Sequence, residues 1–257
     1  MLSQLALKLL LVPLFIGLVS LAGKRWGPTI AGWLAGLPVV AGPILFILWL
    51  EQGSTFARGA AVYSLAALAP VMAFALVYAW GSRRWGWARA STVAYGTWLL
   101  CAVTILALPL GILTAALLAA SGLILAAFAL PHPAPTPGRV RLPKHELALR
   151  MLAGVVLTLL VTSIANIGGS HVSGVLSLFP VISGVLTVFV HRSGGSDAAI
   201  ATLRGLARGL WSLAAFCVVL AIDPAHSTAL VFVTATAIAF GVQALTPRRA
   251  AAYKPPS

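Results

Sequence analysis

Apolar residues run through most of this chain in long stretches, separated by short polar or glycine- and proline-containing segments. A helix needs about 20 residues to cross a hydrocarbon core of about 30 Å. Nine stretches approach or exceed that length, near residues 4–22, 27–50, 57–80, 87–107, 110–130, 147–166, 170–191, 199–222 and 226–245. The fourth and fifth come from one continuous run, which we divide at Leu108–Gly111 because its proline and glycine favour a turn. The pattern predicts an all-α polytopic membrane protein with about nine transmembrane helices.

The chain also contains an internal repeat. The segment Gly27–Gly42 returns later in the chain as Gly169–Gly184, with glycines and a proline in ungapped register, and Lys8 matches Arg150 in the same register. Spans one to four and six to nine form the two copies, so the unpaired fifth span turns the second copy upside down. The sequence therefore predicts two inverted-topology four-helix repeats joined by one extra helix, an arrangement typical of secondary transporters.

This repeat divides the chain into five parts. Residues 1–107 form the first membrane repeat, 108–130 the connecting helix and 147–246 the second, inverted repeat. Residues 131–146 hold five prolines and several bases, which is typical of an extended cytoplasmic linker. Residues 247–257 form a short basic tail, expected in the cytoplasm or against anionic headgroups.

Composition and charge support this membrane interpretation. With 60% hydrophobic and 8% charged residues, the chain has too little polar surface for a soluble domain. The loop Lys and Arg residues behind the net charge of +13 lie almost entirely on one side of the nine predicted spans. Only Lys8 and Arg58 lie on the other side. By the positive-inside rule, we expect the N-terminus outside and the C-terminus in the cytoplasm. The basic residues are then explained by membrane topology and lipid contact, and no nucleic-acid partner is expected.

The first apolar stretch has a second interpretation, as a signal peptide cleaved after Ala22. We favour a retained span, because its counterpart in the second copy is internal to the chain. Cys101 and Cys217 each lie within apolar runs, so they are expected to be buried thiols without a disulfide.

A candidate substrate site lies in the second span of each repeat, where prolines and glycines interrupt the helix. A proline frees a backbone carbonyl in the preceding turn, here near residues 34 and 176, and such a group needs protein, water or ligand at membrane depth. Paired discontinuous helices mark the substrate site of many transporters. Kinking or close helix packing alone is the alternative explanation. The candidate substrate-binding residues are Gly36, Pro38, Gly42, Leu178, Pro180, Gly184, Arg204 and Arg208.

The two arginines enter this set because they lie inside an apolar run. Arg204 and Arg208 are one helical turn apart and share a face of the eighth span. They either point into the bundle, where they would attract an anionic substrate, or extend to the headgroups at the cytoplasmic end. The sequence leaves both orientations open.

The sequence offers few residues suited to ion coupling, catalysis or metal binding. The four acidic residues all fall at predicted span ends, so no carboxylate is expected at mid-membrane for ion coupling. His226 and Asp223 are too few for a zinc site, and no nucleophile–base pair or phosphate-binding glycine loop stands out. We therefore expect neither an enzyme nor a metal or other cofactor.

The first half resembles the GlpM-type family of small bacterial inner-membrane proteins. The resemblance covers Ile30–Trp80 and depends on Ala31–Gly32, Pro38, Glu51, Gly53 and Pro70. Members are about half as long, so each repeat looks like one copy of a fused pair. In the second half Ser193 and Gly194 replace Glu51 and Gln52, and no proline matches Pro70. The resemblance implies a bacterial cytoplasmic membrane and a role connected with the cell envelope.

Two functions follow as hypotheses. The first is an inner-membrane secondary transporter or lipid flippase for an anionic or amphipathic, envelope-related substrate such as a lipid-linked intermediate, working by alternating access. The alternative is a non-transporting scaffold or accessory subunit of an envelope polysaccharide or lipid biosynthesis complex. Membrane lipids are the expected surroundings, and the sequence leaves open a homo-oligomer or a biosynthetic partner.

Overall fold

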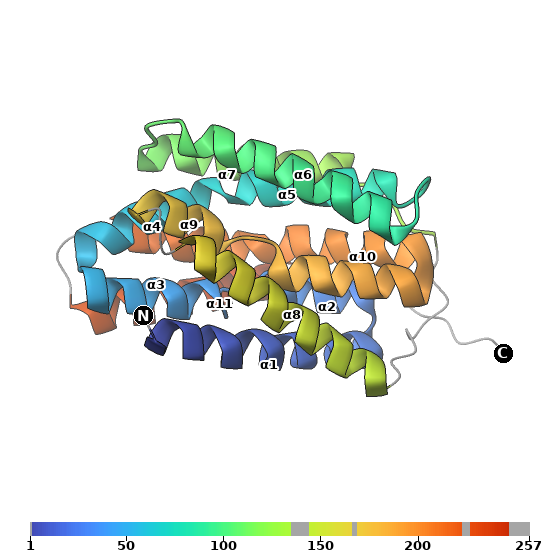
Figure 1. Ribbon diagram of the computed structural model, residues 1–257. Helices are drawn as coiled ribbons and strands as arrows, with labels where there is room; N and C mark the ends of the chain where they lie inside the picture. Colours follow the sequence, from blue (N-terminus) through green and yellow to red (C-terminus); the bar gives the residue numbers. More distant parts are fainter. Residues whose placement is uncertain (1, 135–143, 166–168, 223–226, 247–257) are drawn as a thin grey trace.

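The computed structural model describes residues 2–134, 144–165, 169–222 and 227–246, and all regular structure in these residues is helical (Figure 1). The helices are α1 (Leu2–Trp26), α2 (Pro28–Ala35), α3 (Ala41–Gln52), α4 (Ser54–Ala66), α5 (Leu68–Gly81), α6 (Trp87–Leu106), α7 (Ile112–Ala129), α8 (Lys144–Ala165), α9 (Gly169–Ser177), α10 (Val181–Ile222) and α11 (Thr228–Leu245). The predicted all-α class is therefore confirmed. The tail 247–257 and most of the linker 131–146 lie outside the described residues, as do Asp223 and His226.

Five helical segments among the described residues are long and apolar enough to cross a membrane. They are Ser54–Gly81, Trp87–Leu106, Ile112–Ala129, Gly169–Ile222 and Thr228–Leu245. The chain is thus a helical protein with several membrane-span candidates. Helices also cover the described part of the other predicted spans, although crossing by all nine remains a prediction.

The helices break at matching places in the two halves of the chain. The second predicted span is interrupted between α2 and α3, and its counterpart in the second repeat is interrupted between α9 and α10. Positive φ angles occur, among the described residues, at Gly27 and Gly169 and again at Gly53 and Gly195, which are two pairs in the register of the repeat. Glycine suits these turns because it has no Cβ to clash at positive φ. The angle at Gly195 divides α10 into two parts, residues 181–194 and 196–222.

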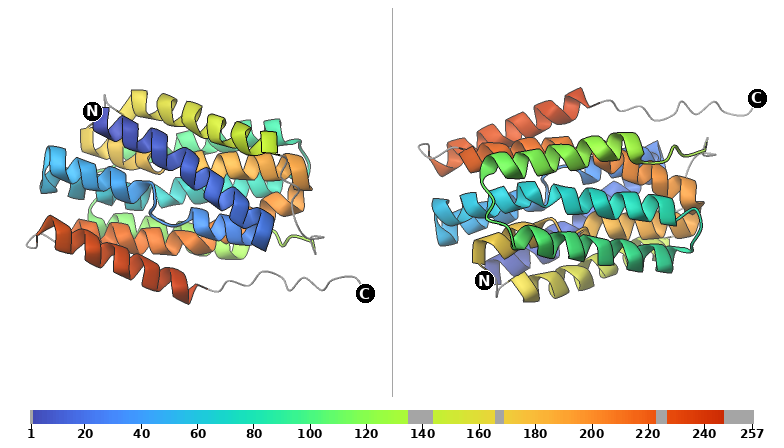
Figure 2. Two further views of the ribbon diagram at one scale, coloured as in Figure 1. Left: turned by 90° about the horizontal axis from the view of Figure 1, so that it is seen from below. Right: turned by 90° about the horizontal axis from the view of Figure 1, so that it is seen from above.

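Helices α1 and α8, which correspond in the register of the repeat, run in opposite directions. In Figure 1 the chain enters α1 at the left and α8 at the right, and these two helices pack against each other. The two views of Figure 2 show the same lengthwise bundle, with α11 leading towards the end where α1 finishes. We call that end, where α1, α5 and α7 finish, the basic end, because Lys24, Arg25, Arg83, Arg84 and Arg192 lie there or in the adjoining turns.

The buried core centres on α4, α5 and the second part of α10, where Phe74, Met72 and Leu203 are fully enclosed. Helices α6, α7 and α11 lie at the periphery and carry large apolar side chains outwards, for example Leu100, Leu113 and Phe240. Such a surface suits hydrocarbon rather than water. Helices α6 and α7 are joined by the turn at 107–111, where the sequence predicted one, and Tyr63 Oη donates a 2.8 Å hydrogen bond to the Leu108 carbonyl there.

Candidate functional site

The two helix breaks lead into one buried apolar cluster. Val40 is the last residue of the first break, and Val181 and Ile182 are the first residues of α10 after the second. All three are partly buried and pack against the enclosed side chains of Val12, Ile16 and Val185. The sequence proposed a site between Pro38 and Pro180, and the structure brings the residues next to these prolines against a common cluster.

The first break packs on the second part of α10. A Cβ on Gly36 would stand 2.6 Å from the Gly209 Cα, and one on Gly42 would stand 3.4 Å from the Phe216 ring. Pro38 is buried, and its carbonyl accepts a 2.9 Å hydrogen bond from the Gly42 N–H that starts α3. These residues of the candidate site therefore hold two helices in close contact.

The second break packs on α6 instead. The Pro180 carbonyl accepts hydrogen bonds from Gly184 N–H at 3.0 Å and from Tyr95 Oη at 3.2 Å. A Cβ on Gly184 would overlap the Tyr95 hydroxyl. Leu178, just before the second break, is nearly buried, with 9% of its surface exposed. Phe179 stacks on Tyr95 with ring centroids 5.5 Å apart. An aromatic residue thus takes the place beside Gly184 that Phe216 takes beside Gly42.

Protein donors occupy the carbonyls that the sequence identified as free. Leu34 O accepts from Leu37 N–H at 3.1 Å, and Leu176 O accepts from Phe179 N–H at 3.1 Å. Nearby, Ser212 Oγ lies 3.4 Å from Gly36 O. N–H groups in the tight turns donate to the two carbonyls, and the Ser212 hydroxyl approaches the neighbouring one. These backbone groups therefore need no ligand in the described conformation.

The two halves contact each other through exchanged pairs of residues. A Cβ on Gly32 of α2 would overlap the Thr202 carbonyl oxygen of α10, and a Cβ on Gly174 of α9 would overlap the Ala60 carbonyl oxygen of α4. In the register of the repeat, Gly174 is the counterpart of Gly32, and Thr202 is the counterpart of Ala60. Each half therefore offers the same two positions to the other half, as two partners do in an isologous contact.

A second exchanged pair follows the same register. A Cβ on Gly205 would overlap the Thr29 carbonyl oxygen, while Tyr63 and His171 stack with ring centroids 4.0 Å apart. His171 is the repeat counterpart of Thr29, and Gly205 is the repeat counterpart of Tyr63. The exchange thus extends over at least two positions of the contact between helices, although different side chains fill the two versions.

The two predicted arginines have different surroundings. Arg204 Nη1 donates a 2.6 Å hydrogen bond to the Leu130 carbonyl just after α7, and Nη2 lies 3.4 Å from His132 Nε2. A cation at a helix C-terminus binds the last carbonyls and complements the helix dipole. Arg208 is partly exposed and makes no hydrogen bond or ion pair with the described residues. Arg204 therefore holds the C-terminal end of α7, and its hydrogen bonds go to residues outside the two breaks.

Among the arginines that the structure describes, Arg150 of α8 is the one with a buried side chain. Its side chain is 1% exposed, and its Nη2 donates a 2.6 Å hydrogen bond to Glu146 one turn earlier. Nη1 lies 3.4 Å from Ser20 Oγ of α1, the guanidinium stands 5.3 Å from the Phe189 ring centroid, and Nε has no hydrogen-bond partner. Burying a charged guanidinium group costs free energy, and a donor that makes no hydrogen bond leaves part of that cost uncompensated.

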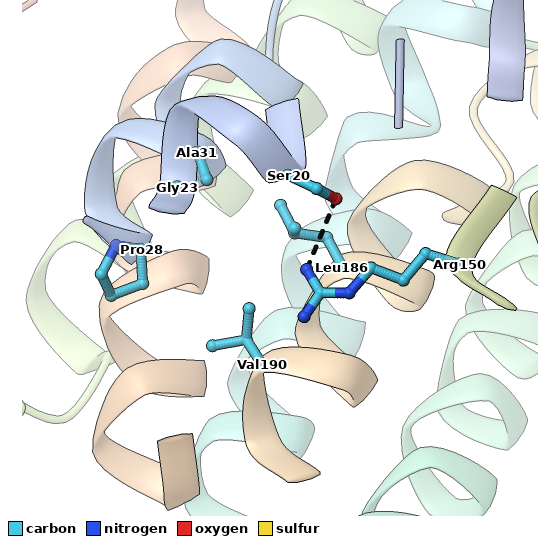
Figure 3. A pocket seen from close by; sticks show the side chains of 7 residues that line it. All are labelled: Ser20, Gly23, Pro28, Ala31, Arg150, Leu186 and Val190. Atoms are coloured by element: carbon cyan, nitrogen blue, oxygen red, sulfur yellow. Dashed lines mark hydrogen bonds between the residues drawn. The ribbon is translucent and has the colours of Figure 1, made fainter. Parts of the chain in front are cut away.

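Beside this group lies a small apolar hollow with room for about one water molecule. Figure 3 shows the Arg150 guanidinium pointing between α1, α2 and the first part of α10, with the dashed hydrogen bond to Ser20. The hollow is lined by Ser20, Gly23, Pro28, Ala31, Arg150, Leu186 and Val190. In the sequence, Arg150 stands out only as the counterpart of Lys8. The signals available were that match and the position of Glu146 one helical turn before Arg150, but neither reveals burial.

Within the described residues no group of three or more His, Cys, Asp or Glu side chains is arranged to hold a metal ion. Comparisons with protein-family models, curated protein sequences and solved structures find no match to this chain.

Proposed function

We propose that this protein is a membrane transporter, either a secondary transporter or a lipid flippase, whose two repeats of opposite orientation move against each other. The observation that carries this proposal is the exchange of contacts, in which Gly32 faces Thr202 and Gly174 faces Ala60. A pair of contacts related in this way fits a pseudo-two-fold axis between two similar halves. The opposite directions of α1 and α8 fit an axis in the membrane plane.

Such an arrangement gives a physical route to alternating access. Each half presents a broken helix, α2–α3 or α9–α10, to a helix of the other half. Both contacts are close in the described structure, so alternating access requires one of them to open at a time while the other stays closed. The cluster around Val12, Ile16 and Val185, which both breaks reach, then lies on the path between the two ends.

The proposed substrate is anionic or amphipathic. The support for this class is the gathering of Lys24, Arg25, Arg83, Arg84 and Arg192 at the basic end, together with the enclosed Arg150. A concentrated positive field raises the local concentration of anions. By resemblance to the GlpM-type proteins, we place the protein in a bacterial inner membrane, with the basic end in the cytoplasm and a substrate connected with the envelope.

Cysteine labelling tests the movement. Cys101 and Cys217 are replaced by alanine, and one cysteine is introduced by Val40→Cys or Ile182→Cys, positions that flank the central cluster. Membrane-impermeant maleimide is added to sealed vesicles of known orientation. We expect each position to react from one side, and the reactive side to change on addition of a substrate mixture of envelope lipids and small anions.

Val103→Cys is the matched control, because Val103 lies on the periphery of α6 and is 56% exposed. Its labelling should not change with the state of the bundle. Equal protection of Val40→Cys and Ile182→Cys under all conditions would instead favour the scaffold hypothesis. Epitope tags at the two termini test the underlying geometry independently, since an odd number of crossings places them on opposite faces.

A further inference from the structure

We infer that one face of α9 and the first part of α10 is a path for protons across the bundle, and that the proton is the coupling ion of transport. The coupling role rests on the proposed function, whereas the path itself stands on a row of contacts. The row begins at His171 and ends at His191, and each member follows the one before it by three or four residues, which places the members of each helix on one face. Between the two histidines lie Gly174, Ser177, Pro180, Gly184 and Thr187. We call these seven positions the polar row.

The first half of the polar row meets polar side chains of α4. The exposed His171 ring stacks on the buried Tyr63 ring with centroids 4.0 Å apart. Ser64 Oγ, which is fully buried, lies 3.0 Å from Gly174 O and 2.9 Å from Ser177 Oγ. In Figure 1 this part of the bundle lies opposite the basic end. The row therefore leads from an accessible imidazole at that end to hydroxyls in the interior.

The second half of the row meets tyrosines of α5 and α6. Tyr95 Oη donates a 3.2 Å hydrogen bond to Pro180 O and would be overlapped by a Cβ on Gly184. Tyr78 Oη lies 3.1 Å from His191 Nδ1, and the two tyrosine rings pack on the same phenylalanine of α5. Tyr78 is fully buried, whereas His191 is partly exposed at the basic end. The row thus has an accessible imidazole at each end and hydroxyls between them.

Thr187 is the member of the row with an open hydrogen bond. Its side chain is fully buried, and its Oγ1 has no partner among the described residues. It lies one helical turn after Gly184, which touches a tyrosine hydroxyl, and one turn before His191. A buried hydroxyl without a partner costs free energy. Its position between two proton-carrying groups gives that cost a purpose.

The architecture of the repeat does not require these polar groups. The corresponding row of the first repeat consists of Thr29, Gly32, Ala35, Pro38, Gly42, Leu45 and Trp49. It carries one hydroxyl and neither histidine, so Leu45 stands where the second repeat has Thr187 and Trp49 where it has His191. Ionisable side chains inside a membrane protein are costly and mark proton relays. The polar row therefore points to a function of the second repeat.

The chemistry of the row suits a proton. Its polar groups lie at hydrogen-bond distance from one another, which leaves no room between them for a larger substrate. Hydroxyls and neutral imidazoles both donate and accept hydrogen bonds. A proton from water enters at a ring nitrogen of His171, each hydroxyl passes its own proton onward and accepts the next, and His191 releases one proton to water. Each group ends with the protons it had at the start.

The break at Pro180 connects this path to movement. It separates Ser177 from Tyr95, and the carbonyl between them accepts hydrogen bonds but has no proton to pass on. The path is therefore closed at the break in the described conformation. A proton crosses when the break moves, and such a movement is the one that the proposed function assigns to the broken helices.

The charged groups around His191 leave the proton free to move. Arg192 follows it in sequence and lies over a tryptophan ring of α6, and the pair of Arg150 and Glu146 approaches the same turn of α10 from α8. Tyr78 is the titratable group from α5, while α1 and α2 pack apolar side chains against this turn. The one carboxylate named here is bound to Arg150 at 2.6 Å, so it does not hold a proton-bearing His191 in place.

Thr187→Val is the decisive variant, because valine keeps the shape and removes the hydroxyl. The protein is reconstituted into vesicles of phosphatidylethanolamine and phosphatidylglycerol that enclose a pH-sensitive dye, and a potassium diffusion potential drives protons inwards. We expect a flux above that of protein-free vesicles, and we expect Thr187→Val to lower it about tenfold, because one lost hydrogen bond raises the barrier to transfer. Its thermal midpoint in detergent should not fall, since Oγ1 has no partner to lose among the described residues. A purely structural role would not give this combination.

His191→Gln should lower the flux as well, because glutamine cannot carry a proton at the basic end. Thr104→Val is the matched control for the hydroxyl, since Thr104 is exposed on α6 outside the row. His132→Gln is the matched control for the imidazole, since His132 lies beyond α7 outside the row. Both controls should conduct protons like the wild type.

The path is refuted if the wild type conducts no better than protein-free vesicles, or if either Thr187→Val or His191→Gln conducts like the wild type. The labelling of Val40→Cys and Ile182→Cys separates this outcome from failure of the transport proposal. State-dependent labelling without a flux that needs the row leaves transport standing and removes the path. A flux that needs the row, with invariant labelling, leaves a proton path in a protein that does not transport by alternating access.

Discussion

The contact of α2 with α10 and the contact of α4 with α9 occupy corresponding places in the two halves, yet different residues build them. Gly32, Gly36, Gly205 and Gly209 bring the α2 and α10 backbones together without intervening side chains. Between α4 and α9, Gly174 is accompanied by ring stacking of Tyr63 on His171 and by hydrogen bonds of Ser64. The first contact is backbone on backbone, and the second is largely polar.

This difference has a consequence for movement. A glycine contact is close-packed, and sliding one helix along the other meets side chains or opens voids. Ser64 Oγ has three partners within 3.0 Å, namely Ala60 O, Gly174 O and Ser177 Oγ, and its one proton can go to only one of them at a time. Hydroxyl groups can exchange partners as helices shift. We therefore expect the α4–α9 contact, which lies away from the basic end, to open more easily than the α2–α10 contact.

The largest expected effect comes from overpacking the glycine contact. In the double variant Gly32→Ala/Gly205→Ala, two methyl groups would overlap the Thr202 and Thr29 carbonyls. Each substitution should lower the free energy of unfolding by about 1–3 kcal/mol, measured by thermal unfolding in detergent. Gly96→Ala is the control, because nothing lies within 4 Å of that position. An unchanged midpoint in the double variant would show that the two helices are not in contact.

A smaller loss is expected from Gly174→Ala in the second contact. The added methyl group would overlap the Ala60 carbonyl and stand 2.9 Å from Tyr63 Cβ, an overlap less severe than the one at Gly32. We expect a loss of roughly 1–2 kcal/mol, below that of Gly32→Ala measured in the same detergent. A loss larger than that of Gly32→Ala would reverse the comparison between the two contacts.

Tyr63→Phe sharpens the comparison further, because it keeps the ring on His171 and removes the hydroxyl. The hydrogen bond from Tyr63 Oη to Leu108 O at 2.8 Å is lost, and with it the contact of Leu110 N–H at 3.4 Å. The expected destabilisation is about 1 kcal/mol. Faster hydrogen exchange in the turn 107–111 should accompany it, and unchanged exchange would contradict the role assigned to the hydroxyl.

The smallest effect is expected from Ser64→Ala, at about 0.5–1 kcal/mol, because Ser177 Oγ still binds Gly174 O at 2.7 Å. A double-mutant cycle with Ser177→Ala isolates the 2.9 Å contact between the two hydroxyls. If the polar contact is the mobile one, Ser64→Ala should also change the labelling of Ile182→Cys from the side opposite the basic end. Strictly additive effects with unchanged labelling would argue for a rigid contact at both places.

Much of the fold could be predicted from local sequence features. Apolar runs indicated helices, and the proline and glycine of Leu108–Gly111 indicated the turn between α6 and α7, which the structure has at 107–111. The breaks near Pro38 and Pro180 were also predictable, because a proline removes a helical hydrogen bond wherever the helix packs. The interruption at Ala67, between α4 and α5, lies one turn before Pro70 and has the same physical cause, but it was not predicted.

The candidate site was less predictable. Arg204 and Arg208 stood out because of their apolar neighbours in sequence, but Arg204 binds the Leu130 carbonyl at the end of α7. Arg150 drew attention only as a repeat partner, because its place near a helix start resembles that of an ordinary surface base. Its burial depends on α1, α2 and α10, which are distant in sequence and meet only in the folded bundle.

The sequence by itself determined the helical class, the apolar segments, the internal repeat and the places where the helices break, because composition and backbone chemistry act locally. Only the tertiary structure decided which helices exchange contacts, which carbonyls find donors and which arginine is enclosed. These properties depend on the groups that approach from other parts of the chain, and a buried charge or carbonyl takes its character from those neighbours.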